Sequence, residues 1–411
     1  MSNSAESSER YGAMQGEDRH LIRWLVRGVC LIVSAILVLS AANGWSAVVP
    51  ALSPFLAAAS LLATGTVHAL IWVALPVACM VLLRPRWFCR WICPLGLCAD
   101  GVSYLGRRWG RRPMKSTQLG QWIVWLTLGG ACLGLPLLLW LDPLALFTSL
   151  FRLAGPRSAS AAWIGIIPVS IALLLNLVWP QAWCGRICPL GALQNLLSRL
   201  AKCLLRIVRR GDSFRPGSDG TGPLARRAVL GVMAGAASAW VVRSPRAWAA
   251  HPLRPPGALE EPELLGVCVR CGNCVRACPT AIIEPDLGGH GLASLLTPVL
   301  HFQDGYCRED CTACTRVCPS GALSRLSVRE KPHMRIGLPR VDMNVCLLAE
   351  DRECAECSRW CPYGAIRYVF SEIEYTLIPW IDPEKCTGCG ACEVACPTSP
   401  KKAIVVVPHS V

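Results

Sequence analysis

Sixteen of the 25 cysteines lie between Cys268 and Cys396, with the spacing of iron–sulfur ligands. They form four runs, each with three cysteines close together and, after three further residues, a Cys-Pro pair. Three thiolates of such a run hold three corners of a 4Fe–4S cluster, and the cysteine before proline ligates a partner cluster. The sequence therefore predicts four 4Fe–4S clusters, with the ligands Cys268, Cys271, Cys274, Cys278, Cys307, Cys311, Cys314, Cys318, Cys346, Cys354, Cys357, Cys361, Cys386, Cys389, Cys392 and Cys396.

Zinc ribbons and disulfides are the alternatives for so many cysteines. Zinc ribbons use two separated Cys-x2-Cys pairs rather than a triple followed by Cys-Pro. Residues 251–411 otherwise show little apolar periodicity, so a domain there needs more than a hydrophobic core. We expect an α+β, bacterial-ferredoxin-like domain that its clusters hold together.

A second type of cysteine motif occurs twice in the first half of the chain. Cys89 and Cys93, and again Cys184 and Cys188, form Cys-x3-Cys-Pro-Leu-Gly motifs, each preceded by an apolar helix and followed by basic residues. Two related halves would bring the four thiols together at one membrane face. Soft thiolates at one place can hold a further cluster or a single metal ion, or act as a redox dithiol. The residues alone leave these alternatives open.

The elements that position these motifs are predicted to be membrane helices. Hydrophobic residues make up 53% of the 411 residues, and the mean hydropathy is +0.40. Apolar stretches at 21–42, 66–83, 119–141 and 161–179 approach the ~20 residues that cross a bilayer, and 43–65 reads as an outside loop. The net charge of +14 comes from arginines beside apolar stretches, which follows the positive-inside rule and does not indicate nucleic-acid binding.

Residues 224–250 join the two halves and resemble an export signal. They begin with Arg226-Arg227, continue through a weakly apolar run, and end in Ala247-Trp248-Ala249. A twin-arginine start is typical of the Tat route. The alternative is an ordinary fifth transmembrane helix. The predicted domains are a disordered cytoplasmic tail (1–20), two repeated helical hairpins (21–210), a linker (211–223), the signal or anchor (224–250) and an exported cluster domain (251–411).

His68 and Asp142 are candidates for a quinol site near the outer face, because an ionisable residue at membrane depth is often functional. The alternative is a packed histidine and a helix-capping aspartate. One histidine in the membrane region argues against a bis-histidine haem. The basic residues after both Cys-Pro motifs predict that their four thiols lie at the cytoplasmic face. These thiols would then lie roughly 30 Å, a full bilayer, from the exported clusters.

These residues resemble two families joined in one chain. The repeated helices and the paired Cys-x3-Cys-Pro motifs are similar to the NapH-type membrane quinol dehydrogenases, which are related to the membrane core of NosR. Residues 224–411, with Arg226-Arg227 and four cluster motifs, resemble the MauM/NapG family of Tat-exported polyferredoxins. NapH-type proteins usually carry cytoplasmic cluster motifs after the fourth helix, and here the exported domain follows instead.

The resemblance implies an electron-transfer component, rather than a stand-alone catalyst, in a bacterial inner membrane. It would oxidise quinol from the membrane pool and pass electrons to a periplasmic acceptor such as a nitrate reductase, after export by the Tat translocase. A redox maturation factor for a periplasmic metalloenzyme is the alternative. As in polyferredoxins with an insertion, the two outer motifs would pair with each other, and so would the two inner motifs. Cys396 would then complete the first cluster and Cys278 the fourth, while Cys361 would complete the second and Cys318 the third.

Overall fold

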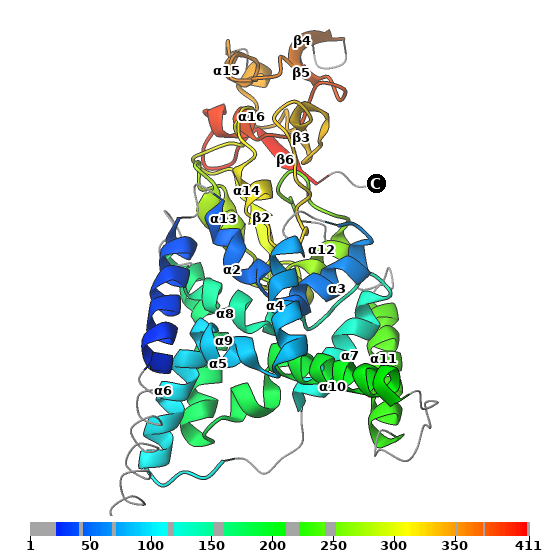
Figure 1. The fold of residues 1–411 in the computed structure, drawn as a ribbon. Coiled ribbons are helices and arrows are strands. Elements are labelled where there is room, and N and C mark those ends of the chain that lie inside the picture. The colour runs from blue at the N-terminus through cyan, green and yellow to red at the C-terminus, as the bar shows by residue number, and fades with distance from the viewer. Residues whose placement is uncertain are drawn as a thin grey trace, which may run out of the picture.

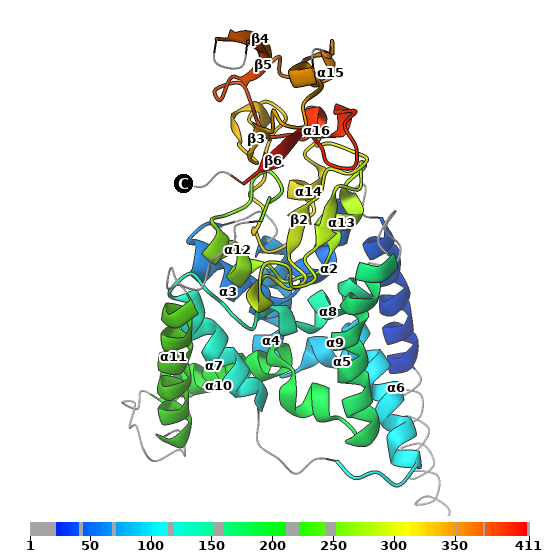
Figure 2. The same ribbon diagram turned by 180° about the vertical axis from the view of Figure 1, so that it is seen from behind.

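The computed structural model describes residues 22–40, 44–67, 71–113, 119–151, 159–210, 222–242, 252–350, 352–372 and 375–408. A block of helices formed by residues up to 242 carries, at one end, a region of short helices and strands formed by 252–408 (Figures 1 and 2). The predicted tail 1–20, His68 and the signal end 243–250 lie outside the described residues, as does most of the linker 211–223.

The helical block is built from two halves with the same order of elements. The first contains the helix Ile22–Leu39, η2 (Trp45–Ala47), α2 (Val48–Ala51), α3 (Pro54–Thr64), α4 (Ile71–Leu83), α5 (Trp87–Trp91) and α6 (Pro94–Arg108). The second contains α7 (Leu119–Ala131), η3 (Leu139–Leu141), α8 (Pro143–Ser149), α9 (Ala159–Val178), the π-turn η5 (Trp183–Ile187) and α10 (Pro189–Arg210). The helix α11 (Gly222–Val242) follows.

The predicted long spans differ from the helices that form. The stretch 119–141 does not make one helix, because α7 ends at Ala131 and Gly134 (φ +80°) and Pro136 redirect the chain. The helix α4 has 13 residues, about 20 Å, which is shorter than the hydrocarbon core. Among the described residues one helix, Ile22–Leu39, is long and apolar enough to cross a membrane by itself.

The segment predicted as an outside loop contains a bent pair of helices. Trp45–Ala51 and Pro54–Thr64 meet at 93°, and together they are apolar enough for a broken span or a re-entrant loop. The bend lies at Ser53, whose backbone is extended and whose hydroxyl accepts a hydrogen bond from the Leu56 N–H (3.3 Å). The polar N-cap and the proline after it begin a new helix in the middle of an apolar stretch.

A helix that begins with proline occurs four times in the helical block, and these four helix starts form the core. The helices α3, α6, α8 and α10 each begin with proline, and the residue after each proline is almost completely buried. These buried residues belong to one packed cluster: Phe55, Leu95, Leu144 and Leu190. The residues before the prolines are Ser53, Cys93, Asp142 and Cys188. The repeat thus gathers two cysteines of the Cys-Pro motifs, a serine and an aspartate around the centre of the block.

The helix α11 packs tightly against α7 through small residues. An added Cβ at Gly235 would lie 2.1 Å from the Leu126 carbonyl oxygen, and one at Gly231 would lie 2.6 Å from the Trp125 Cβ. Gly231 and Gly235 have the four-residue spacing that lets two helix backbones approach closely in membranes. The twin arginines, Arg226 and Arg227, are exposed near the N-terminal end of α11.

The region 252–408 consists of short elements around the cysteines. Its helices are α12 (Glu261–Val267), α13 (Asn273–Ala277), η7 (Leu292–Ser294), α14 (Ala313–Arg316), η8 (Lys331–His333), η9 (Leu347–Glu350), α15 (Glu356–Arg359) and α16 (Ala391–Ala395). Its antiparallel strand pairs are β1 (Ile283–Pro285) with β2 (Pro298–Leu300), β3 (Leu338–Val341) with β6 (Ile404–Val407), and β4 (Ile366–Ser371) with β5 (Thr376–Ile381). In β3–β6, Leu338 lies opposite Val407.

Candidate iron–sulfur centres

The sixteen C-terminal cysteines gather in four groups of four, which we call centres I to IV. Three groups each line one cavity, and in the fourth burial raises the pKa of Cys392, as do the thiols of Cys389, Cys386 and Cys361, which act on it electrostatically. Centre I contains Cys268, Cys271, Cys274 and Cys318; centre II contains Cys278, Cys307, Cys311 and Cys314; centre III contains Cys346, Cys354, Cys357 and Cys396; centre IV contains Cys361, Cys386, Cys389 and Cys392.

The predicted pairing of outer motifs with outer motifs is therefore wrong. Cys318 completes the first motif rather than the third, and Cys396 completes the third rather than the first. The reason is that each neighbouring pair of motifs folds back on itself. The helix α13 of the first motif packs on α14 of the second, and α15 of the third packs on α16 of the fourth. Two sequential two-centre units result.

The chemistry of these groups fits a 4Fe–4S cluster. Burial, followed by the neighbouring thiols Cys307, Cys278 and Cys311, raises the pKa of Cys314 to about 12. Thiolates collected in such a place need cations to balance their charge, and cluster irons supply them. Backbone N–H groups also point at ligand sulfurs, as from Leu323 to Cys318 Sγ (3.4 Å) and from Ala365 to Cys361 Sγ (3.3 Å). Such hydrogen bonds tune cluster potentials.

The four centres follow one another from the helical block to the far tip. The Cys307 N–H of centre II donates to the Cys389 carbonyl of centre IV (2.8 Å), which joins the two units. Figure 1 shows α13, α14, α16 and α15 at increasing distance from the helical block. The spatial order is therefore I, II, IV, III.

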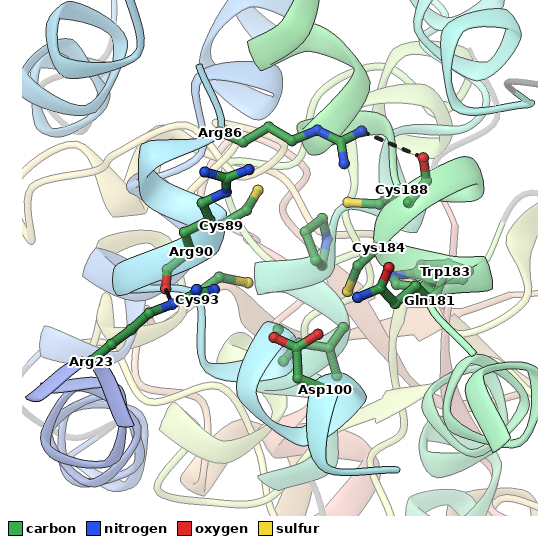
Figure 3. Close-up of a pocket in the computed structure, with 14 residues that line it drawn as sticks. Arg23, Arg86, Cys89, Arg90, Cys93, Asp100, Gln181, Trp183, Cys184 and Cys188 are labelled. Carbon is green, nitrogen blue, oxygen red and sulfur yellow. Dashed lines mark hydrogen bonds between the residues drawn. The ribbon is translucent and has the colours of Figure 1, made fainter. Parts of the chain in front are cut away.

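The helical block holds a fifth group of four cysteines. Cys89, Cys93, Cys184 and Cys188 line a cavity of about 200 Å³ together with three arginines, Asp100 and Trp183. Figure 3 shows the two cysteines of the first motif facing the two of the second. Within the described residues, no three His, Cys, Asp or Glu side chains are gathered closely enough for a single metal ion.

The surroundings of this cavity fit a negatively charged group such as a thiolate-ligated cluster. Arg27 is 3% exposed and pairs with Asp100 (2.8 Å), but its Nε and Nη2 have no hydrogen-bond partner among the described residues. The indole N–H of Trp183 is likewise buried without a partner there. Such orphaned buried donors require an explanation. Cys93 and Cys188 also stand at the N-termini of α6 and α10, where the helix dipole favours negative charge.

Asp142, which the sequence predicts in a turn near the outer membrane face, has a buried side chain. It is completely buried at the start of α8, where it accepts hydrogen bonds from the Leu144 N–H (2.9 Å) and the Ala145 N–H (3.3 Å). Ser53 Oγ donates to its other oxygen and so joins the two halves of the repeat. The next residue, Pro143, lines the four-cysteine cavity. Asp142 thus caps a helix beside that cavity.

The structure also contains an apolar groove between α3 and α4, which the sequence does not predict. It has a volume of about 320 Å³ and begins at Pro54, the residue after Ser53. Val67, immediately before the undescribed His68, also lines it. The sequence signal for this groove is the run of small residues in α3, because Ala57 and Ala58 line the groove.

Centre I rests directly on the helical block. The Asn273 side chain donates to the Ser46 carbonyl (3.1 Å), and Arg276 donates to the Val38 carbonyl (2.8 Å) and to Asn273 Oδ1 (2.9 Å). Arg270 stacks over the Trp140 ring (5.9 Å to the centroid). Cys271 of centre I belongs to the same packed cluster as Cys93 and Cys188. Centre I and the four-cysteine cavity are thus parts of one packed core.

Comparisons with known proteins agree with this arrangement. The family described as "4Fe-4S dicluster domain" matches residues 267–322, and families described as "4Fe-4S binding domain" match 377–398 and both 66–112 and 161–209. MauM of Methylobacillus flagellatus, a methylamine utilization ferredoxin-type protein, is 36% identical over 200 residues, which cover 45% of this chain and 81% of that protein. The chain belongs to the MauM/NapG family of ferredoxin-type proteins. No solved structure matches it.

Two further relatives show how far the likeness extends. The ferredoxin-type protein NapG of Escherichia coli is 38% identical over 168 residues, 38% of this chain and 71% of NapG. NapF of the same organism is 31% identical over 154 residues, 37% of this chain and 84% of NapF. Iron–sulfur ferredoxin-type domains are thus confirmed. The dicluster match spans centres I and II, in agreement with their sequential pairing.

Within this MauM/NapG-type domain, Lys331 places a buried positive charge at centre II. It is 3% exposed, and its ammonium group donates to the carbonyls of Arg308 and Cys311. We expect Lys331→Met to lower the midpoint potential of centre II by about 60 mV, the equivalent of about 1.4 kcal/mol for one electron. The reason is that the reduced cluster carries one more negative charge. A redox titration followed by EPR measures this shift, with Lys331→Arg as the charge-preserving control; an unshifted potential in Lys331→Met would contradict the assignment.

Proposed function

We propose that this chain is a membrane-bound quinol dehydrogenase component that passes electrons through four 4Fe–4S clusters to a periplasmic acceptor. The proposal rests on the direct contact between centre I and the helical block. Asn273 and Arg276, which lie within the first cluster motif, both donate hydrogen bonds to carbonyl groups of the helical block. The relatives are ferredoxin-type proteins, which fits iron–sulfur electron transfer. The helical half takes the part of a NapH-type protein fused to its exported partner.

The quinol site is proposed at the apolar groove between α3 and α4. Its walls suit a ring with a hydrophobic tail, and at one end it reaches the helix start that Ser53 and Asp142 hold. Oxidation of a quinol releases two electrons and two protons. The electrons pass to the centres one at a time, and the Asp142 carboxylate and His68 are the proposed proton acceptors.

The four-cysteine cavity is proposed to hold an additional cluster on this path. The match of residues 66–112 and 161–209 to a 4Fe-4S binding family supports this, as do the orphaned Arg27 and Trp183 donors. A cluster there would supply a one-electron centre on the proposed path to centre I. The chain's own residues supply four thiolates, positive charge and a water-poor core.

The proposed topology places the C-terminal region in the periplasm of a bacterium. Figure 1 shows this region at the end of the helical block opposite the end of α6, which carries Arg107 and Arg108. Basic residues mark the cytoplasmic side. The tight packing of α11 on α7 supports a twin-arginine segment that remains as a fifth anchoring helix after Tat-dependent export.

The proposal is tested on the full-length protein, purified in detergent without oxygen. A short-chain menaquinol is added, and the bleaching of the cluster absorbance is followed. We expect reduction by the quinol and a slower reduction in Asp142→Asn, which keeps the shape of the side chain. Clusters that stay oxidised with every quinol would contradict the proposal and favour a redox maturation factor instead.

A further inference from the structure

We propose that the β4–β5 hairpin is the docking surface for the electron acceptor and that electrons leave the protein from centre III. The inference rests on the proposed electron-transfer function. The partner it fits is a water-soluble redox protein with an apolar surface around its own cofactor. The hairpin lies at the tip of the molecule, farthest from the helical block (Figure 1).

Centre III is the last in the spatial order I, II, IV, III and one of the less enclosed. Three of its cysteines, Cys346, Cys354 and Cys357, are only partly buried. Three cysteines of centre I are also partly buried, but the helical block covers that end of the domain. Centre III is therefore the one that a protein approaching from solution reaches most directly.

One face of the hairpin runs from centre III to the solvent. Alternate residues of a strand share a face, and three opposed pairs follow one another along it: Ile366 with Ile381, Tyr368 with Pro379, and Phe370 with Leu377. The first pair is largely buried, and in the second the Tyr368 hydroxyl lies 3.4 Å from Cys357 Sγ. Pro379 lines the cavity of centre III. The apolar face thus begins at the cluster ligands.

The outer end of this face is exposed. Phe370 is 56% exposed, Leu377 46%, Tyr375 82% and the neighbouring Trp360 53%. An isolated two-stranded hairpin is marginally stable, and large apolar side chains gathered on one mark an interaction surface. Next to its turn, the hairpin is held by Thr376, whose hydroxyl donates to the Leu348 carbonyl in η9 (2.8 Å). The long spacer between Cys346 and Cys354 forms η9, so the unusual spacing of this motif supports the hairpin.

Several charged side chains near this surface have a partner within the chain. The Trp360 indole N–H donates to Glu356 (3.2 Å), and Arg367 stacks on Trp380 (4.0 Å). Lys385 pairs with Asp382 (4.0 Å). A partner that docks here is therefore recognised mainly by apolar contact, and its association should depend weakly on ionic strength, unlike an electrostatically steered encounter.

The test starts from full-length protein reduced with dithionite, so it does not depend on quinol oxidation. Reoxidation is followed after addition of the soluble periplasmic fraction of the host, and separately after addition of ferricyanide. Leu377→Ser and Phe370→Ser should slow reoxidation by the soluble fraction about tenfold or more. Ferricyanide should oxidise all variants at the same rate. Leu287→Ser is the matched control, because Leu287 is a leucine of similar exposure (50%) elsewhere on the domain.

A photo-crosslinking residue at position 370 identifies the occupant. A crosslink to a soluble protein with a redox cofactor, together with slowed reoxidation in the serine variants, supports the proposal. Equal reoxidation by the soluble fraction in all variants overturns it, as does a crosslink to a second copy of this chain or to lipid. An unchanged EPR signal of centre III in each variant shows that the domain is intact. Failure of quinol to reduce the clusters would instead count against the proposed function.

Discussion

Replacing Cys318 with serine is expected to remove the cluster of centre I and to leave the other three C-terminal centres in place. Cys318 lies with Cys268, Cys271 and Cys274 around one cavity. A second substitution in the same centre should then cost no further iron, whereas one in another centre should. Cys268→Ser combined with Cys318→Ser should therefore lose one cluster, and Cys346→Ser combined with Cys318→Ser should lose two.

Iron and sulfide analysis of anaerobically purified protein, with EPR of the reduced state, measures this outcome. The reverse pattern, with Cys318 and Cys346 acting as one site, would restore the pairing of inner motifs. Cys396→Ser gives the complementary control, because it should combine with Cys346→Ser at no further cost in iron.

Replacing Cys93 and Cys188 together with serine should lower the rate of cluster reduction by quinol about 100-fold or more. The loss of these thiols would remove the cluster proposed for the four-cysteine cavity, which is proposed to pass electrons from the quinol to centre I. Reduction of centres I to IV by dithionite should be unchanged, because their ligands are elsewhere. Stopped-flow absorbance with each reductant measures the two rates.

Cys132→Ser is the control for this pair, since Cys132 is an exposed thiol that lines none of the described cysteine cavities. An unaltered quinol rate in the double variant would show that the four-cysteine cavity lies off the path. A loss of reduction with both reductants would show instead that the variant has lost its fold.

The sequence indicates which three cysteines of one run lie together, because the spacing within a run is a local property. It predicts the partners of the Cys-Pro cysteines poorly, because these depend on how α13 packs on α14 and α15 on α16. In the helical half, the repeat and its two cysteine motifs are visible in the sequence. The breaks in the apolar stretches, at Ser53-Pro54 and at Gly134, are local signals that the hydropathy of a long window hides.

The contacts between the two halves could not be predicted from the sequence. Asn273 and Arg276 sit inside a cluster motif, where a sequence reading assigns them to the ferredoxin loop alone. Asp142 appears in the sequence as a charge between two apolar stretches, which suggests an outer loop. Asp142 is buried because the N-terminus of α8 lies against the N-terminus of α3, where Ser53 donates a hydrogen bond to it across the repeat. This is a tertiary contact, which the local sequence does not reveal.

One continuous electron path is proposed to lead from the helical block through centres I, II, IV and III. The most direct measurement mixes oxidised full-length protein with a short-chain menaquinol, freezes samples at increasing times and records EPR spectra. We expect the four-cysteine centre to be reduced first and centre I before centre III, and we expect Cys93→Ser/Cys188→Ser to slow reduction of every C-terminal centre about 100-fold or more. Reduction of the C-terminal centres at full speed in that double variant would contradict a path through the four-cysteine cavity.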